Sequence, residues 1–175
     1  KLYSKAKQIV AGGNMLLSKR PEMFLPELWP SYFSKTEGCK VWDMDGNEFV
    51  DTLMMPGTNT LGYSHPEVDE AVKKIINEGN MSTLNAPEEV ELTEKLIEIH
   101  PWADMARFAR SGGEANSVAI RIARAASGKD NVAFCGYHGW HDWYLSANLG
   151  DDSTLDGHLL PGLEPKGVPQ NLKGT

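Results

Sequence analysis

Residues 105–136, MARFARSGGEANSVAIRIARAASGKDNVAFCG, constrain the fold more than any other part of the chain. An amphipathic helical pattern, beginning near Glu114 and ending at Gly128, lies between two short runs that are typical of strands, MARFAR and NVAFCG. Strand, helix and strand in this order form a right-handed crossover between parallel strands. The sequence therefore predicts an α/β fold, with a mostly parallel sheet covered by helices.

The N-terminal region predicts a different arrangement. Residues 32–52 alternate apolar and polar side chains on either side of Asp45-Gly46, which is a two-residue hairpin signal. We therefore expect an N-terminal antiparallel hairpin of short strands. Its acidic residues do not have the spacing of a calcium-binding EF-hand loop, so turn formation is the preferred interpretation.

Two further helices are predicted between these regions. Apolar residues from Val68 to Ile76 recur at helical spacing after Pro66, and Gly79 follows as a stop signal. A second helix is expected to start at Pro87 and to end before Pro101. From Asp151 onward the chain is rich in Gly and Pro, which predicts a long irregular excursion.

Composition limits the class of protein. The chain has 17 Lys and Arg against 24 Asp and Glu, a net charge of −7, and no run of like charges, which argues against a nucleic-acid or membrane partner. No stretch has the roughly 18 consecutive apolar residues of a membrane helix, and the first residues are too polar for a signal peptide. We expect a cytoplasmic protein in which Cys39 and Cys135 are free, buried thiols.

The glycine pair at 112–113 suggests an anion site. The first amides of a helix have no helical partners and lie at the positive end of its dipole. Gly112 and Gly113 have no side chains to keep a phosphate away, and Ser111 is suited to cap the helix. Glu114 and Asn116 either cap the helix or orient cofactor contacts, with capping preferred. The alternative is that the two glycines form only a strand-to-helix turn.

The stretch GYHGWHDWY, residues 136–144, is expected to supply a second wall of the site. It follows the predicted strand NVAFC, and ligands of parallel sheets bind at the carboxyl ends of strands. Tyr137 and His138 would then meet a flat heteroaromatic ring that carries a phosphate. Two alternatives stay open, namely a metal site formed by His138, His141 and Asp142, and a purely structural aromatic cluster.

Several blocks of the chain carry a family resemblance. FARSGGEANSVAIRIARAASGKDNVAFCGYHGWHD, together with KVWDMDGNEFVD, LGYSHPEV and NAPEEVELTEKLIE, resembles the N-terminal part of class III aminotransferases, in particular the glutamate-1-semialdehyde 2,1-aminomutases. These are pyridoxal-phosphate enzymes of fold type I. The resemblance implies amino-group transfer, or aminomutase chemistry, on a small amino or oxo compound.

The resemblance also implies roles for individual residues. Ser111, Gly112 and Gly113 would bind the cofactor phosphate, Tyr137 would stack on the pyridine ring, and His138 would lie beside it. Relatives often have Ser or Thr at the position of Gly113, and an aromatic residue near the position of Pro56. Residues 55–57, Met-Pro-Gly, would therefore form either a pocket wall or an ordinary bend.

The resemblance places the remaining catalytic residues outside the chain. Transamination requires a lysine that forms a Schiff base, and no lysine here lies in a matching motif. We expect an incomplete enzyme: residues 1–62 would belong to a small domain, residues 63–175 to the first part of the large cofactor-binding domain, and the isolated segment would be inactive. The family also implies a homodimer with shared active sites. The alternative function is a non-catalytic α/β module that binds a phosphate-containing cofactor.

Overall fold

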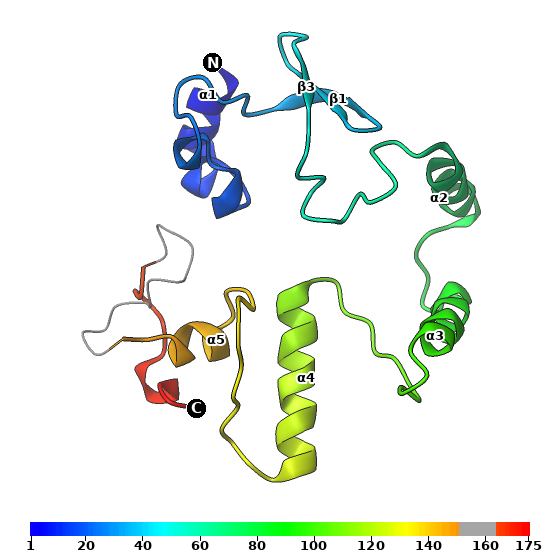
Figure 1. The fold of residues 1–175 in the computed structure, drawn as a ribbon, viewed down its shortest axis with the longest axis vertical. Helices are drawn as coiled ribbons and strands as arrows, with labels where there is room; N and C mark the ends of the chain where they lie inside the picture. Colours follow the sequence, from blue (N-terminus) through cyan, green and yellow to red (C-terminus); the bar gives the residue numbers. More distant parts are fainter. Residues whose placement is uncertain (151–163) are drawn as a thin grey trace. The chain divides into compact units, whose positions relative to one another are not determined.

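The computed structural model describes residues 1–150 and 164–175, which form two compact units, Lys1–Ala86 and Pro87–Thr175 (Figure 1). The expected boundary between residues 62 and 63 stays a prediction. Most of the Gly- and Pro-rich excursion expected after Asp151 lies outside the described residues. None of the described helices is long and apolar enough to cross a membrane.

The first unit begins with short helices. Their bounds are α1 Leu2–Ile9, η1 Ala11–Gly13, η2 Leu17–Lys19 and η3 Pro21–Met23. The side chain of Glu22 connects η3 to α1, because its carboxylate accepts a 2.7 Å hydrogen bond from the Tyr3 hydroxyl and lies 3.7 Å from the Lys7 ammonium. Ala6, Gly13 and Pro21 form the buried centre of this helical segment.

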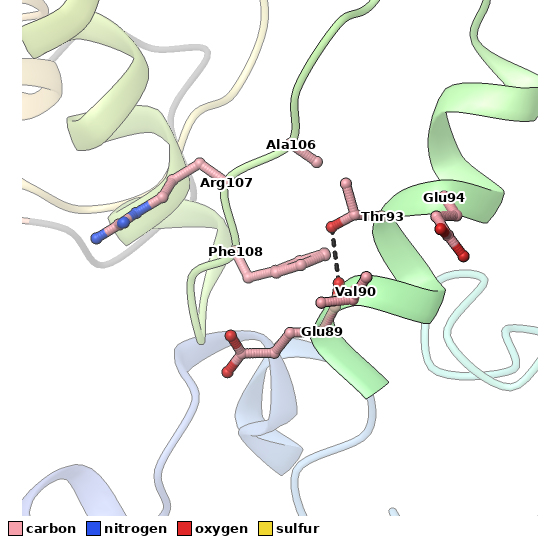
Figure 2. A pocket seen from close by; sticks show the side chains of 7 residues that line it. All are labelled: Glu89, Val90, Thr93, Glu94, Ala106, Arg107 and Phe108. Carbon is pink, nitrogen blue, oxygen red and sulfur yellow. Dashed lines mark hydrogen bonds between the residues drawn. The ribbon is translucent and has the colours of Figure 1, made fainter. Parts of the chain in front are cut away.

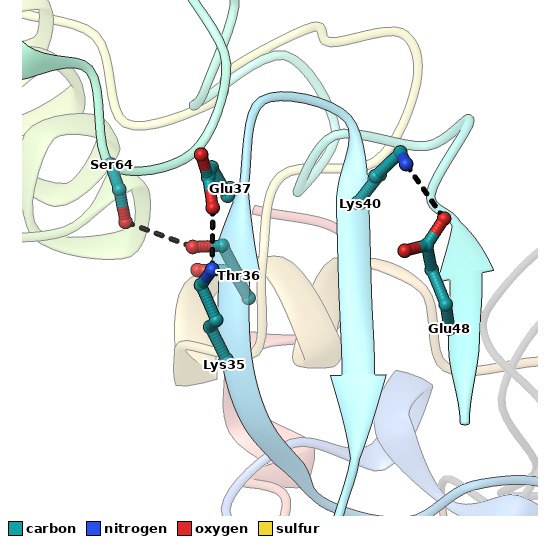
Figure 3. Close-up of polar contacts among 6 residues, drawn as sticks. All are labelled: Lys35, Thr36, Glu37, Lys40, Glu48 and Ser64. Carbon is teal, nitrogen blue, oxygen red and sulfur yellow. Dashed lines mark hydrogen bonds and ion pairs between the residues drawn. The ribbon is translucent and has the colours of Figure 1, made fainter. Parts of the chain in front are cut away.

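A three-stranded antiparallel sheet follows, in the order β1-β2-β3. The strands are β1 Phe33–Glu37, β2 Lys40–Asp43 and β3 Glu48–Val50. Figure 3 shows two ion pairs on it: Lys35 with Glu37, and Lys40 with Glu48 at 2.8 Å between β2 and β3. The prediction of short antiparallel strands in residues 32–52 is confirmed.

The turn between β2 and β3 is longer than the predicted two-residue loop. Residues 44–47 lie between the strands, and the Asp43 amide donates to the Asn47 carbonyl at 3.0 Å. The Asp43 carboxylate accepts hydrogen bonds from the amides of Asp45 and Asn47, both at 2.9 Å. Gly46 adopts a φ of 87°, which favours glycine. The carboxylate therefore organises a wider turn, as expected for a turn residue.

The segment after the sheet returns to it at Gly38. The amide and carbonyl of Gly38 exchange hydrogen bonds with those of Tyr63, at 2.9 and 2.8 Å, and Ser64 donates to the Thr36 carbonyl at 3.0 Å (Figure 3). Gly62 approaches so closely that an added β-carbon would lie 3.2 Å from the α-carbon of Gly38. Glycine is required at this position, because its φ is also +93°.

Residues 54–59 form a tight bend between β3 and this return. The Thr58 amide donates to the Met55 carbonyl at 3.1 Å, and Gly57 has a φ of 83°. This geometry agrees with the alternative that Met55, Pro56 and Gly57 form an ordinary bend. The pocket-wall role stays a prediction.

Helix α2, Pro66–Glu78, ends the first unit and confirms the predicted helix. Pro66 occupies its first turn, Glu67 and Asp69 lie near its positive end, and Gly79 follows with a φ of 108°. Each of these features favours a helix boundary at the observed place. The apolar stripe that predicted the helix is exposed, with Val72 at 52% and Ile76 at 57%.

The second unit contains α3 Glu88–Ile99, α4 Gly112–Ser127, α5 Asp142–Ala147 and η4 Gln170–Leu172. Helix α3 follows Pro87 and ends before Pro101, as predicted. Helix α4 starts at Gly112, two residues before the predicted position, and ends at Gly128, whose left-handed φ of 67° is a common helix terminator. Both predicted helices are confirmed.

The predicted parallel sheet is not observed among the residues that the structure describes. Residues 105–110 and 131–136, which we expected to be strands, are coil on either side of α4 (Figure 1). The amide of Val132 donates instead to the Thr175 carbonyl at 2.9 Å. An apolar run favours an extended chain, but a strand forms only where a neighbouring strand accepts its hydrogen bonds. The described sheet is wholly antiparallel.

The two cysteines also differ from expectation. Cys39 and Cys135 are free, as predicted, but both are exposed. Cys39 lies between β1 and β2 beside Gly38, and Cys135 lies in the coil after α4. The prediction that these thiols are buried is wrong, because neither segment is covered by another layer among the described residues.

The buried centre of the second unit surrounds α5. Tyr144 and Ser146 have no exposed surface, and Asn148, Leu149 and Val168 are almost fully buried. The Asn148 side chain donates to the Tyr144 carbonyl at 2.6 Å and closes the end of the helix. Burial at α5 fixes the loop that precedes it, residues 136–141, against the start of α4.

Candidate cofactor-binding site

The start of α4 is closed by reciprocal side-chain hydrogen bonds. The Ser111 hydroxyl accepts from the Glu114 amide at 3.3 Å, and the Glu114 carboxylate accepts from the Arg110 amide at 2.8 Å. Serine followed three residues later by glutamate is the sequence signature of a capping box. The preferred interpretation of Glu114 as a capping residue is therefore confirmed, and Ser111 occupies the N-cap position as predicted.

Two amides at this helix start have no protein partner among the described residues. The amide of Glu114 is bound by Ser111, and that of Ala115 donates to the Ser111 carbonyl at 3.0 Å. No hydrogen bond from the described chain reaches the amides of Gly112 and Gly113. A β-carbon on Gly112 would meet nothing within 4 Å, so the space over it is open. Two unpaired donors at the positive end of a helix are suited to an anion.

The loop 136–141 is bound to the first turns of α4. The Asn116 side chain donates to the His138 carbonyl at 3.4 Å, and the Ser117 hydroxyl lies 2.8 Å from Nδ1 of His141. Asn116 and Ser117 lie three and four residues after Gly113, on the same side of the helix. The two walls expected from the sequence are therefore in contact.

Gly113 is in close contact with the imidazole of His141. A β-carbon on Gly113 would lie 2.7 Å from Nε2 and 2.8 Å from Cδ2 of this ring. The ring is held on its other side by the Ser117 hydroxyl and lies 4.9 Å from the Trp140 ring. Glycine is therefore required at position 113 because of its neighbour, independently of any ligand.

An aromatic cluster around Tyr144 packs against the loop 136–141. Tyr144 is fully buried, and its ring contacts those of Phe134, Tyr137, His138 and Trp143, at centroid distances from 5.3 to 5.8 Å. The Tyr144 hydroxyl donates to the Gly136 carbonyl at 3.1 Å. Burial raises the pKa of this hydroxyl above its ordinary value, so Tyr144 stays a neutral donor. The cluster confirms a structural role for these aromatics and leaves room for a binding role.

Tyr137 and His138 differ in how available they are. Tyr137 is 53% exposed, with its ring set against the edge of Tyr144. Nε2 of His138 donates to the Cys135 carbonyl at 2.8 Å, and the ring packs between aromatic neighbours. Neither ring makes a hydrogen bond or ring contact with Ser111, Gly112 or Gly113 within the described part of the chain. Of these two residues, His138 contacts α4 through its backbone carbonyl, which accepts the hydrogen bond from Asn116.

The alternative metal site has a different geometry from the one a metal would need. Nε2 of His138 donates to the Cys135 carbonyl and Nδ1 of His141 lies 2.8 Å from the Ser117 hydroxyl, so one nitrogen of each ring is held by a different partner. In residues 1–150 and 164–175, no three side chains of His, Cys, Asp or Glu gather in a way that could bind a metal ion.

Sequence reasoning missed two contributors to the site. Ser117 was not singled out, although its position one helical turn after Gly113 places it on the same face. Tyr144 was treated only as the end of the aromatic stretch. Tyr144 lies in α5, which packs against η4, and its burial has no local signature in the sequence.

A hollow of the second unit lies elsewhere (Figure 2). It is an open groove between α3 and the segment 106–108, with a volume of about 520 Å³. Figure 2 shows Val90 and Phe108 in its wall and the carboxylates of Glu89 and Glu94 at its sides. None of the predicted site residues lines it.

Comparison with known proteins identifies the family. The family model for class III aminotransferases matches residues 27–156. The 3-aminobutyryl-CoA aminotransferase of Cloacimonas acidaminovorans (strain Evry) is 39% identical, over 85% of this chain and 36% of that relative. The glutamate-1-semialdehyde 2,1-aminomutase of Methanothrix thermoacetophila is 37% identical, over 96% of this chain and 37% of that protein.

Solved structures agree with this assignment. An omega-transaminase from Sphaerobacter thermophilus matches with a TM-score of 0.78 and 29% identity, over 98% of this chain and 39% of that one. A transaminase with PLP bound matches with a TM-score of 0.77 and 31% identity, over 97% and 39%. The chain thus spans little more than a third of the length of these relatives, and it adopts the corresponding part of their fold. It belongs to the class III aminotransferase family.

Proposed function

We propose that this chain forms the phosphate-binding part of a pyridoxal-phosphate enzyme. The enzyme acts on a small amino or oxo compound, and it either transfers an amino group to a second molecule or moves the group within one molecule. The proposal rests on family membership together with one observation. Among the described residues, the amides of Gly112 and Gly113 have no hydrogen-bond partner at the positive end of α4, and the space beside Gly112 is open.

The residues present fit the phosphate group of this cofactor. A phosphate needs hydrogen-bond donors and a positive potential, and the helix start offers both. Ser111 has its hydroxyl oxygen occupied as an acceptor from Glu114, which leaves the hydroxyl proton free to donate. Ser111, Gly112 and Gly113 are therefore proposed as the phosphate-binding residues.

The aromatic wall fits the ring of the cofactor. Tyr137 offers an exposed ring that buried Tyr144 holds in place, and His138 fixes the loop through Cys135. We propose that Tyr137 stacks on the pyridine ring and that His138 borders it. An aromatic contact of this kind contributes about 0.5–1.5 kcal/mol beyond its buried area.

The cofactor, when bound, supplies an electron sink for breaking a bond next to the substrate nitrogen. The contribution of this chain is binding and orientation: donors at α4 anchor one end, and the loop 136–141 limits tilting of the ring. No lysine within residues 1–175 lies in a motif that matches the Schiff-base lysine of the family. We therefore infer that the 175 residues alone do not catalyse turnover.

The family also supports proposals about the assembly. We propose that the protein works as a homodimer with shared active sites, in the cytoplasm. Its substrates would be a small amino donor and a small oxo acceptor.

Ligand binding by the full-length encoded protein tests this function. Pyridoxamine phosphate and pyridoxamine differ only in the phosphate, so the ratio of their dissociation constants measures phosphate recognition. We expect at least about a hundredfold preference for the phosphorylated form, since two or more hydrogen bonds to a charged group contribute about 3 kcal/mol or more. We expect the Gly112→Asp variant, which places a carboxylate at the anion site, to lose most of this preference for pyridoxamine phosphate.

Equal affinity of the wild type for both ligands would overturn the phosphate site. The matched control is Ala126→Asp, in which the same charge is added to an exposed position near the other end of α4. Activity is tested separately, by mixing pyridoxal phosphate, an amino donor and an oxo acid with the full-length protein. Turnover by the isolated 175 residues would contradict the inference that they are inactive.

A further inference from the structure

The imidazole of His141 lies at the edge of the proposed phosphate site. Its Nε2 is 2.7 Å from the point where a β-carbon on Gly113 would lie, and Gly113 is the second residue of α4. In the described chain no protein group forms a hydrogen bond with this nitrogen, whereas Nδ1 is bound by Ser117 at 2.8 Å. Nδ1 therefore has a hydrogen-bond partner in Ser117, whereas Nε2 lies beside Gly113 without one among the described residues.

The hydroxyl of Ser117 makes this arrangement adaptable. A hydroxyl both donates and accepts, so it can donate to Nδ1 while Nε2 carries the proton. An anion near Nε2 fits that tautomer, because it offers an N–H donor. Ser117 thus holds the ring through Nδ1 and leaves Nε2 available to a ligand.

We propose that His141 is a phosphate-binding residue, positioned by Ser117, that donates from Nε2 to the cofactor phosphate beside the amides of Gly112 and Gly113. This inference rests on the proposed function and adds a side-chain donor to it. The ring of His141 occupies the space that a side chain on Gly113 would fill, and it brings a side-chain nitrogen to this position.

Packing alone does not account for the arrangement. The ring centroid lies 4.9 Å from that of Trp140, and the residue is only partly buried. A ring that served only to fill space against α4 would not need a hydrogen bond fixed at Nδ1. The tether instead sets the direction of Nε2, which is what a ligand contact requires.

The test uses the full-length encoded protein with pyridoxamine phosphate, and pyridoxamine as the matched ligand without phosphate. His141→Phe keeps the ring and removes both nitrogens. We expect it to weaken binding of pyridoxamine phosphate about tenfold, which corresponds to one charge-assisted hydrogen bond, and to change binding of pyridoxamine less than about twofold. The ³¹P resonance of the bound ligand should also shift between wild type and variant.

Two further variants sharpen the result. Ser117→Ala releases the ring and should give a smaller loss confined to the phosphorylated ligand, while Ser117→Thr keeps the hydroxyl and should restore binding. His100→Phe is the matched control and should leave both affinities unchanged, because His100 is exposed and, among the described aromatic rings, contacts only Trp102.

The outcomes separate this inference from the proposed function. If the wild type prefers the phosphorylated ligand and His141→Phe keeps both the preference and the ³¹P shift, the role of His141 is wrong and the amide site stands. If His141→Phe weakens both ligands equally, the ring is structural and the inference is again overturned. If the wild type shows no preference at all, the phosphate site itself fails.

Discussion

Nε2 of His141 and the α-carbon of Gly113 are so close that one added methyl group would fall 2.7 Å from the ring nitrogen. This contact joins the loop 136–141 to α4 and couples the two positions. The effect of a substitution at one position on stability should therefore depend on the residue at the other.

The first prediction is that Gly113→Ala lowers the free energy of unfolding in the wild type but raises it when His141 is replaced by alanine. In the wild-type background the new methyl group pushes against a tethered ring, an overpacking cost of about 1–3 kcal/mol that exceeds the helix gain from replacing glycine, about 0.5–1 kcal/mol. In a His141→Ala background the clash is gone, so the same change should stabilise the protein. Urea unfolding of the four proteins measures both effects. Equal effects in the two backgrounds would show that the contact carries no energy.

The second prediction separates capping from anion binding at Ser111. Ser111→Ala removes the N-cap acceptor for Glu114 and should lower the free energy of unfolding by about 0.5–2 kcal/mol. Ser111→Asp keeps an acceptor and should preserve stability, yet its charge should weaken binding of pyridoxamine phosphate. The paired measurement is urea unfolding and ligand titration. An Asp variant that binds as well as the wild type would contradict an anion site at this helix start.

The third prediction concerns the buried Tyr144. Tyr144→Phe removes the hydrogen bond to the Gly136 carbonyl and should cost about 0.5–1.5 kcal/mol, whereas Tyr144→Ala also leaves a cavity and should cost about 3–5 kcal/mol. Tyr137→Phe is the control, because its exposed hydroxyl makes no hydrogen bond among the described residues. Thermal or urea unfolding checks the order. If Tyr144→Phe is as stable as the wild type, the hydroxyl does not hold the loop.

The fourth prediction follows from Asp51 in the first unit. The Tyr63 hydroxyl donates to the Asp51 carboxylate at 2.5 Å, and this hydrogen bond holds the pKa of the carboxyl below its ordinary value. A lowered pKa in the folded state adds stability above the unfolded pKa, near 3.9, that is lost as pH falls through the folded pKa. Tyr63→Phe should therefore be less stable than the wild type at pH 7.

The difference in the free energy of unfolding between the wild type and Tyr63→Phe should narrow as the pH falls from about 5 toward 2, because both proteins then carry a protonated Asp51. Urea unfolding at a series of pH values measures it. Tyr32→Phe, at a tyrosine with no hydrogen bond of its own in the described chain, should run parallel to the wild type. A constant gap between wild type and Tyr63→Phe at every pH would rule out the pKa explanation.

Local signals predicted the helices and the hairpin well. Pro66, Gly79 and Gly128 mark their helix boundaries through the backbone conformations that they favour. The Ser111–Glu114 capping box is recognised from four consecutive residues. Such features depend on neighbours in sequence, which is why they could be placed without a structure.

Signals that depend on distant partners failed or were missed. The runs at 105–110 and 131–136 indicate strands, but no pattern in them names the neighbours that would accept their hydrogen bonds. The contact of His141 with Gly113 joins residues 28 positions apart in the chain. The sequence indicated that both segments belong to one site, but not that this histidine lies over the glycine.

The central claim is that the amides of Gly112 and Gly113 bind the cofactor phosphate. The most direct measurement is a ¹H–¹⁵N spectrum of the full-length protein, selectively labelled at glycine, during titration with pyridoxamine phosphate and then with pyridoxamine. The account predicts large shifts of the Gly112 and Gly113 resonances that require the phosphate, with Gly79 and Gly128 unmoved. Saturation of the site while the two resonances stay in place would contradict it.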